Sequence, residues 1–274
     1  MKPISNYMPE ENKVNVTKMS APVGAVVEGV DVRDLTDEQF TEINALFCEH
    51  HVLAFPGQDL TPDDQIAFAG RFGELIPFPY MALPDYPNII ELRNKGKKRD
   101  VNQHWHSDMT YNQIPPKLTM LYALEAPEIG GETAFSNQEL AYEELSDGMR
   151  KLIDDLKAHH SAEGLARLYG EDQQAAPRSL HPVARTHDET GRKSLYVCKA
   201  FTRRFDEWSR EESKPLLEYL YEHSVRPEFQ GRHQWRAGDL VMWDNRCVLH
   251  YAVHDHGDDP RVIHRCQVQG LEPA

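Results

Sequence analysis

His106 and Asp108, two residues apart, form the pattern with the clearest chemical meaning in the chain. They lie in a run, 104–111, that we predict to be a strand, where residues i and i+2 point to the same face. The imidazole and the carboxylate would then converge on one point. A facial iron(II) site takes two histidines and one carboxylate on one side of the ion and keeps the opposite positions open. This pair would supply two of the three ligands.

The third ligand must come from a distant strand, and the spacing leaves two candidates. His250 lies in a predicted strand near the end of the chain, whereas His104 would share the face of His106. A second His-x-Asp pattern, His256-Gly257-Asp258, stands among Asp, Gly and Pro residues. That composition predicts an exposed turn rather than a metal site.

Two arginines at the start of the last predicted strand suggest bound anions. Arg265 follows Arg261 at i+4, so both guanidinium groups would point to the same face of that strand. On the surface they would need no partner. If the face is the inner one, however, each needs an anion, because an unpaired buried charge is costly. Two bound anions would meet that need.

Composition narrows the classes of function. The chain has 274 residues and a formal net charge of -14, which argues against a nucleic-acid partner. Its main basic run, 95–99, is short and predicts a solvated loop. Four cysteines without CxxC spacing fit a reducing compartment. Neither a signal peptide nor a membrane-spanning segment is recognisable, so we expect a cytoplasmic protein.

The pattern of elements predicts a mainly β protein. Residues 1–20 are polar and are expected to be partly mobile, and residues 21–274 are expected to form one domain. Many short strands, few of them joined by regular helices, favour a jelly roll or related barrel with helices packed outside. Helices are predicted at 37–50, 62–72, 139–157 and 211–223, and an irregular, mobile flap at 158–182. Strands are predicted at 24–30, 52–55, 89–92, 104–111, 117–123, 132–136, 194–198, 240–243, 248–252 and 262–269.

A series of ordered motifs runs from about residue 24 to 270. They are Phe55-Pro56-Gly57-Gln58, Arg71-Phe72-Gly73, Trp105-His106-Ser107-Asp108, Pro115-Pro116, Gly130-Gly131-Glu132-Thr133, His181-Pro182-Val183, Gly191-Arg192-Lys193, Trp243-Asp244-Asn245-Arg246, His250-Tyr251-Ala252 and Arg261-Val262-Ile263-His264-Arg265. In this set the chain resembles the TauD/TfdA family, the taurine and 2,4-dichlorophenoxyacetate dioxygenases that depend on iron(II) and 2-oxoglutarate.

The resemblance implies a fold, cofactors and roles for particular residues. The fold would be a double-stranded β-helix, a cupin-like jelly roll with flanking helices, in a homodimer or tetramer. The cofactors would be Fe(II), the co-substrate 2-oxoglutarate and O2. The matching positions make His106, Asp108 and His250 the metal ligands, Thr133 and Arg261 the partners of the far carboxylate of 2-oxoglutarate, and Arg265, Asn102, Tyr80 and Phe201 the substrate pocket.

One departure from the family pattern bears on the substrate. A taurine enzyme would offer a histidine in the loop 75–80, which here reads Leu-Ile-Pro-Phe-Pro-Tyr, so taurine itself is in doubt. Our first hypothesis is hydroxylation of a small anion, such as a sulfonate, an alkyl sulfate or an aryloxyalkanoate, with release of succinate and CO2. Alternatives are the same chemistry on an amino-acid-like or biosynthetic carboxylate, with the hydroxyl retained or a desaturation, and a non-catalytic 2-oxoglutarate-binding module. A zinc hydrolase is disfavoured, because this chain has no glutamate placed as a general base beside its histidines in an HExxH-like spacing.

Overall fold

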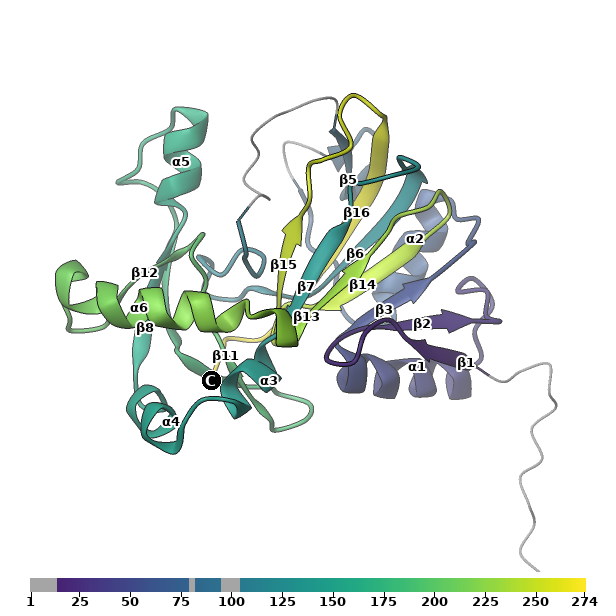
Figure 1. Ribbon diagram of the computed structural model, residues 1–274. Coiled ribbons are helices and arrows are strands. Elements are labelled where there is room, and N and C mark those ends of the chain that lie inside the picture. The colour runs from purple at the N-terminus through teal and green to yellow at the C-terminus, as the bar shows by residue number, and fades with distance from the viewer. Residues whose placement is uncertain (1–13, 79–81, 95–103) are drawn as a thin grey trace, which may run out of the picture.

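The computed structural model describes residues 14–78, 82–94 and 104–274, and two β-sheets form its centre (Figure 1). The larger sheet has eight strands, in the order β1 (Asn15–Lys18), β2 (Ala25–Glu28), β3 (Val52–Phe55), β14 (Leu240–Asp244), β6 (Pro116–Glu125), β16 (Arg261–Gln269), β5 (Tyr86–Asn94) and β4 (Ala82–Leu83). The smaller sheet has three, in the order β13 (Gln230–His233), β7 (Thr133–Asn137) and β15 (Val248–Ala252). Strands from the two ends of the chain are therefore neighbours.

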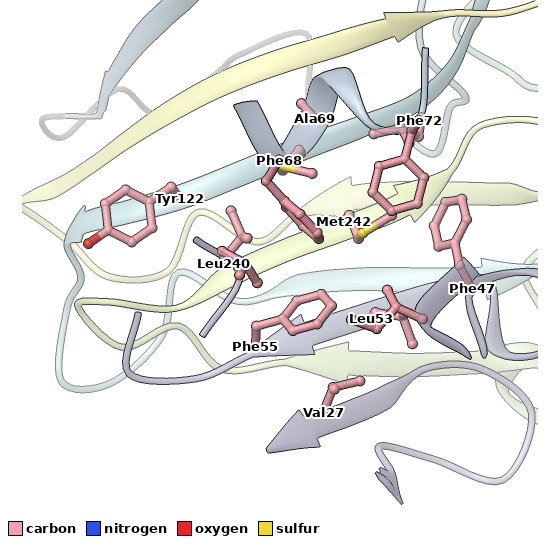
Figure 2. Packing of buried hydrophobic residues seen from close by; sticks show 14 of the residues in the cluster. Val27, Phe47, Leu53, Phe55, Phe68, Ala69, Phe72, Tyr122, Leu240 and Met242 are labelled. Atoms are coloured by element: carbon pink, nitrogen blue, oxygen red, sulfur yellow. The ribbon is translucent and has the colours of Figure 1, made fainter. Parts of the chain in front are cut away.

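The central strands of the larger sheet are apolar on both faces because both faces are covered. On β3, Leu53 and Phe55 pack in a cluster with the flanking helices, whereas Val52 and Ala54 pack in a second cluster with residues of the smaller sheet. This alternation follows from the two-residue period of a strand. Figure 2 shows the first cluster, where Leu53 and Phe55 lie near Phe68. The second cluster joins the sheets face to face and confirms the predicted jelly-roll core.

Two helices cover the outer face of the larger sheet, as predicted. They are α1 (Asp37–His50) and α2 (Pro62–Gly70), and each begins with a capping box, in which Thr36 and Thr61 accept hydrogen bonds from the third helical residue. Phe68 of α2 packs edge to face against Phe55 of β3, with ring centroids 5.7 Å apart. The helices thus bury the face of the sheet that lies away from the metal-ligand candidates.

The rest of the chain builds a second layer of structure beside the sheets. Three strands, β8 (Lys157–Ser161), β9 (Arg178–Pro182) and β12 (Thr202–Phe205), form a small sheet, and β10 (Ala184–Thr186) pairs with β11 (Lys193–Leu195). The helices of this part are α3 (Gln138–Glu143), α4 (Asp147–Ile153), α5 (Glu163–Tyr169), α6 (Arg210–Ser224) and the 3-10 turn η3 (Pro227–Phe229). Within the described ranges, no helix is long and apolar enough to cross a membrane.

Three predicted elements were wrong in detail. The helix predicted at 139–157 is two helices, α3 and α4, because Ser146 caps a new N-terminus. The segment 158–182, predicted to be irregular, contains β8, α5 and β9. The strand predicted at 104–111 is one isolated bridge at His106 followed by turns. The first 13 residues of the predicted mobile segment 1–20 and the basic run 95–99 lie outside the described residues.

A buried ion network holds the loop between β14 and β15. The guanidinium of Arg246 donates to both oxygens of Asp244, at 2.8 and 2.6 Å, and to Asp188 and Glu189, at 2.9 and 2.6 Å. Arg246 and Asp244 are both 0% exposed. Removing one partner of such a pair leaves an uncompensated buried charge, which costs about 3–5 kcal/mol.

We therefore expect Arg246→Leu to lower the free energy of unfolding by about 3–5 kcal/mol, measured by urea denaturation. The matched control is Arg33→Leu, because Arg33 makes a comparable pair with Asp31 on the surface. That control is expected to leave stability unchanged. A loss of stability that is equally small in both variants would contradict the structural role given to Arg246.

Candidate active site

Three side chains from two distant parts of the chain, His106 and Asp108 from one and His250 from the other, converge between the two sheets. The Nε2 atoms of His106 and His250 lie 3.6 and 3.7 Å from Oδ1 of Asp108. The two imidazole rings are 4.1 Å apart, centroid to centroid. One atom from each of the three residues lies within 4.8 Å of the other two, and all three residues are buried. This is the spacing that a single metal ion needs in order to be held by all three.

Backbone pairing and a tight turn place this trio. His106 and His250 exchange backbone hydrogen bonds of 3.1 and 2.8 Å, so their side chains start from adjacent positions. The chain then turns, with Met109 at φ 49, and Ser107 donates to the carbonyl of Asn245 at 2.6 Å. Asp108 thus reaches the histidines through a turn, whereas the strand alternation that we predicted is absent there.

The Asp108 carboxylate is oriented so that one oxygen faces the histidines. Its Oδ2 accepts hydrogen bonds from Thr119 at 2.6 Å and from Gln267 at 3.0 Å. Burial alone would raise the pKa of Asp108, but Arg265 and the two histidines hold that pKa well below its usual value. The group is therefore an anion whose Oδ1 is available to a cation.

Hydrogen bonding of His106 and burial of His250 favour metal binding by these two rings. The Nδ1 of His106 lies 2.6 Å from the carbonyl oxygen of His104, so Nδ1 carries the proton and Nε2 a lone pair. Burial lowers the pKa of His250 to about 3, so this ring is neutral at physiological pH. His104, the competing candidate from sequence spacing, is exposed and lies outside this trio.

The donor set fits iron(II). Two imidazoles and one carboxylate, with no thiolate, match the facial triad of non-haem iron enzymes, which leaves positions for a co-substrate and O2. Two other groups of potential ligands occur among the described residues, His51 with Glu139 and Cys247, and His187 with Asp244 and Cys247. In both, an arginine already binds the carboxylate: Arg192 lies 3.0 Å from Glu139, and Arg246 binds Asp244. In each of these two groups the carboxylate is thus already paired with an arginine of the chain.

A second polar site lies on the same inner face, around Arg261. Ile263 packs in the core between the sheets, so Arg261 and Arg265, two residues away on either side, share its orientation. Arg261 is 5% exposed, no ion pair to it is found among the described residues, and burial lowers its pKa to about 10. Trp235 connects it to Thr133: the indole lies 5.4 Å from the guanidinium and donates to Thr133 Oγ1 at 3.0 Å. Because an uncompensated buried charge is destabilising, we expect Arg261 to bind an anion.

His256 lies beside the same site. This position was not predicted from the sequence. A Cβ on Gly131 would lie 2.8 Å from Cδ2 of His256 and 3.4 Å from Cδ of Arg261, so both side chains border the same point. His256 is 7% exposed, and neither ring nitrogen has a partner in the described part of the chain. The turn that we predicted is present, but its histidine is buried rather than exposed.

Two of the predicted substrate residues, Arg265 and Phe201, lie beside the trio. Nη2 of Arg265 lies 3.6 Å from Oδ1 of Asp108, and its guanidinium stands 5.9 Å from the ring of Phe78. The Phe201 ring meets that of His106 edge to face, with centroids 5.9 Å apart. The two other predicted pocket residues, Tyr80 and Asn102, lie outside the described residues.

Thr119 and Gln267, the two residues that orient Asp108, were missed by the sequence analysis. Gln267 follows Arg265 at i+2 on one strand, so the alternation that linked the two arginines could have pointed to it. Thr119 is a polar residue in the apolar strand β6 and pairs with Gln267 across the sheet. Only the pairing of β6 with β16, which the sequence does not specify, brings both to Asp108.

Comparison with known proteins places the chain among dioxygenases. The model of the family described as taurine catabolism dioxygenase TauD, TfdA family matches residues 15–267. The chain is 34% identical to the alkylsulfatase of Acinetobacter baylyi, over 94% of this chain and 86% of that protein. It is 37% identical to the alpha-ketoglutarate-dependent 2,4-dichlorophenoxyacetate dioxygenase of Cupriavidus pinatubonensis, over 82% and 87%. A solved structure of AAD-2 with Mn(II) and N-oxalylglycine superposes with a TM-score of 0.81 at 31% identity, covering 95% of this chain and 99% of that one.

Proposed function

Because the chain belongs to the TauD/TfdA family of dioxygenases, we propose that it hydroxylates a small anionic organic substrate with iron(II) held by His106, Asp108 and His250. Its co-substrate is 2-oxoglutarate, and its products include succinate and CO2. The single observation that carries the residue assignment is the convergence of two imidazole nitrogens and one carboxylate oxygen within 4.8 Å. The substrate class, a sulfonate, alkyl sulfate or aryloxyalkanoate, follows from the relatives that are named for such compounds.

Each part of the site has its own task. Iron(II) with 2-oxoglutarate and O2 supplies the oxidising chemistry, in which one oxygen atom enters succinate and the other enters a substrate C–H bond. Arg261 and Thr133 bind the far carboxylate of 2-oxoglutarate, because a planar guanidinium can donate two parallel hydrogen bonds and a hydroxyl can donate a third. Arg265 holds the anionic group of the substrate. Thr119 and Gln267 keep Asp108 Oδ1 turned toward the metal.

Replacing Arg265 with alanine is expected to separate substrate binding from co-substrate use. The KM for the anionic substrate should rise by about a hundredfold or more, because a charge-assisted pair is lost in a buried site. Slow formation of succinate without product should persist, since Arg261 and the metal ligands are intact. Steady-state assays that measure succinate and hydroxylated product in parallel check this. Complete loss of succinate formation would assign Arg265 to the co-substrate instead.

His256 is proposed to donate a further hydrogen bond to the far carboxylate of 2-oxoglutarate. We expect His256→Phe, which replaces the ring by an apolar one, to weaken 2-oxoglutarate binding by about tenfold or more, the effect of losing one hydrogen bond to a charged group. His256→Gln keeps a donor and should restore part of the affinity. Anaerobic calorimetric titration of the iron(II)-loaded protein measures both. An unchanged dissociation constant in the phenylalanine variant would exclude this contact.

Product analysis tests the function and separates it from its alternatives. The iron(II)-loaded protein is incubated with 2-oxoglutarate, O2 and a panel of alkyl sulfates, sulfonates and aryloxyalkanoates, and succinate and released sulfate, sulfite or phenol are measured. Release in step with succinate is the expected result. A stable hydroxylated or desaturated carboxylate would favour a biosynthetic role. Binding of 2-oxoglutarate without any O2 consumption would favour the non-catalytic module.

Localisation and assembly belong to the same proposal. We infer a homo-oligomer, as the family resemblance implies, and a cytoplasmic location, as predicted from the sequence. All four cysteines, Cys48, Cys198, Cys247 and Cys266, are free, which suits a reducing compartment. Light scattering of the purified protein measures its mass in solution.

A further inference from the structure

A hollow of about 340 Å³ lies between α5 and the segment 171–177 that follows it. One face of α5 and of the turn before it lines the hollow: Ala162, Leu165, Ala166 and Tyr169 recur at the i, i+3, i+4, i+7 spacing of a helix. Figure 1 shows α5 at the tip of a projection above β8 and β12, away from the two sheets. The hollow is therefore no part of the core between the sheets.

Aromatic rings connect this hollow with the metal-ligand candidates. Tyr111, which also lines it, meets Phe201 edge to face with centroids 5.1 Å apart, and Phe201 in turn meets His106 at 5.9 Å. Leu165 packs both against the cluster of alanines at the hollow and against the cluster that contains Phe201. Side-chain contacts thus run from His106 through Phe201 and Tyr111 to the hollow.

Tyr111 also interacts electrostatically with charged and polar groups on both sides of it. Burial raises the pKa of Tyr111, and the charge of Asp108 and the neighbouring Tyr169 raise it further, while Arg265 opposes them. The Tyr111 hydroxyl is thus within electrostatic range of both the candidate active site and the far wall of the hollow. A second hollow, of about 240 Å³ beside Trp105 and Tyr251, also borders the cluster that contains Phe201, through Cys198 and Leu249.

The lining determines what kind of group fits. Alanine and leucine side chains supply apolar walls with little bulk, and the volume is that of a small-ligand pocket, about 300–1,000 Å³. At the rim stand two exposed acids, Glu171 and Asp172, which disfavour a second anionic group there. The walls therefore favour an apolar group, and the rim disfavours an anionic one.

We propose that this hollow, lined by Tyr111, Leu165, Ala166 and Tyr169, is a binding subsite for an apolar tail of the substrate. The substrate is then a single-headed anion with an extended alkyl or aryl tail, held at its head by Arg265 and at its tail by α5. This inference rests on the proposed function and narrows its substrate class. Taurine, a small molecule with a charged amine, leaves the subsite empty.

Affinity should therefore rise with tail length until the hollow is filled. Each methylene that it buries tightens binding by up to about fourfold. The probes are ethyl, hexyl and decyl sulfate, and in parallel phenoxyacetates with hydrogen, butyl and octyl groups at the para position. Dissociation constants are measured anaerobically by calorimetry, on protein loaded with iron(II) and 2-oxoglutarate, so that binding is read without turnover.

Two variants and a matched control test the location. Ala166→Leu fills part of the hollow and should weaken binding of the long-tailed probes by about tenfold or more, the contribution of two methylenes, while the short probes are unaffected. Tyr169→Ala removes a wall and should have the same selective effect without adding bulk. The control is Leu168→Ala, on the same helix, 56% exposed and absent from the lining. It should leave every dissociation constant unchanged.

These experiments distinguish failure of the subsite proposal from failure of the proposed function. Equal affinity for short and long probes in the unmodified protein overturns the subsite, as does an equal response of short and long probes to both lining variants. Failure of every probe in both series to bind also overturns it. Binding of 2-oxoglutarate to the iron(II)-loaded protein, measured in the same titrations, reports on the proposed function alone. Its loss would point to the metal site rather than to α5.

Discussion

Replacing Asp108 with alanine abolishes succinate formation if the carboxylate is a metal ligand. The structure gives the reason: Oδ1 of Asp108 is the anionic member of the trio, 3.6 and 3.7 Å from the two histidine nitrogens. Removing a group that merely supports a metal ligand costs about 10- to 100-fold, so loss of the ligand itself is expected to cost more. The measurement is 2-oxoglutarate-dependent succinate formation, together with iron(II) content after gel filtration.

The chain offers a matched control for this experiment. Asp258 stands in the second His-x-Asp pattern, is exposed, and lies in a turn. Asp258→Ala should retain full activity and full iron content. If Asp108→Ala behaves in the same way, with iron bound and succinate formed at the native rate, the carboxylate has been assigned wrongly.

Replacing Arg261 with methionine is expected to produce the second large effect, on co-substrate binding. Arg261 is 5% exposed and has no acidic partner among the described residues, so we expect its anion to come from outside the chain. Losing a charge-assisted bidentate contact should weaken 2-oxoglutarate binding by about a hundredfold or more. Metal binding should be unaffected, because Arg261 lies apart from the trio.

A second keto acid provides the control for Arg261. 2-Oxobutyrate has the same keto-acid end as 2-oxoglutarate but no far carboxylate. Its weak binding to the iron(II)-loaded protein should be the same in native protein and in Arg261→Met, whereas Arg261→Lys should restore part of the binding of 2-oxoglutarate. If both keto acids lose affinity equally, Arg261 acts at the metal end or through the fold.

Elements with strong local signals were predictable from sequence. The helix at 37–50 is one, because Thr36 and Gln39 close a capping box and the apolar residues repeat with the period of a helix. The central strands of the larger sheet were also predictable, since short apolar runs such as 52–55 are buried on both faces. The edge strands β1 and β4 were not predicted, because β1 is exposed and β4 has only two residues. The segment 158–182 was not, because β8 and β9 are only partly buried and their polar and apolar residues show no regular alternation.

The candidate site was predictable in its residues but only partly in its geometry. His106 and Asp108 were paired by assuming a strand, whereas a turn after a single bridge brings them together. Their partner His250 was fixed by the ordered family motifs and could not be fixed by spacing. The burial of His256 depends on how its turn folds against Gly131, a contact between residues 125 positions apart. No local pattern carries that information.

Diffraction from crystals grown with Mn(II) and N-oxalylglycine, an unreactive analogue of 2-oxoglutarate, tests the central claim most directly. The anomalous signal of manganese locates the ion independently of any interpretation of the protein. We predict one manganese peak per chain, within bonding distance of His106 Nε2, Asp108 Oδ1 and His250 Nε2, with the far carboxylate of the analogue on Arg261. A peak at His51, Glu139 and Cys247 instead, or no peak at the trio, would contradict the account.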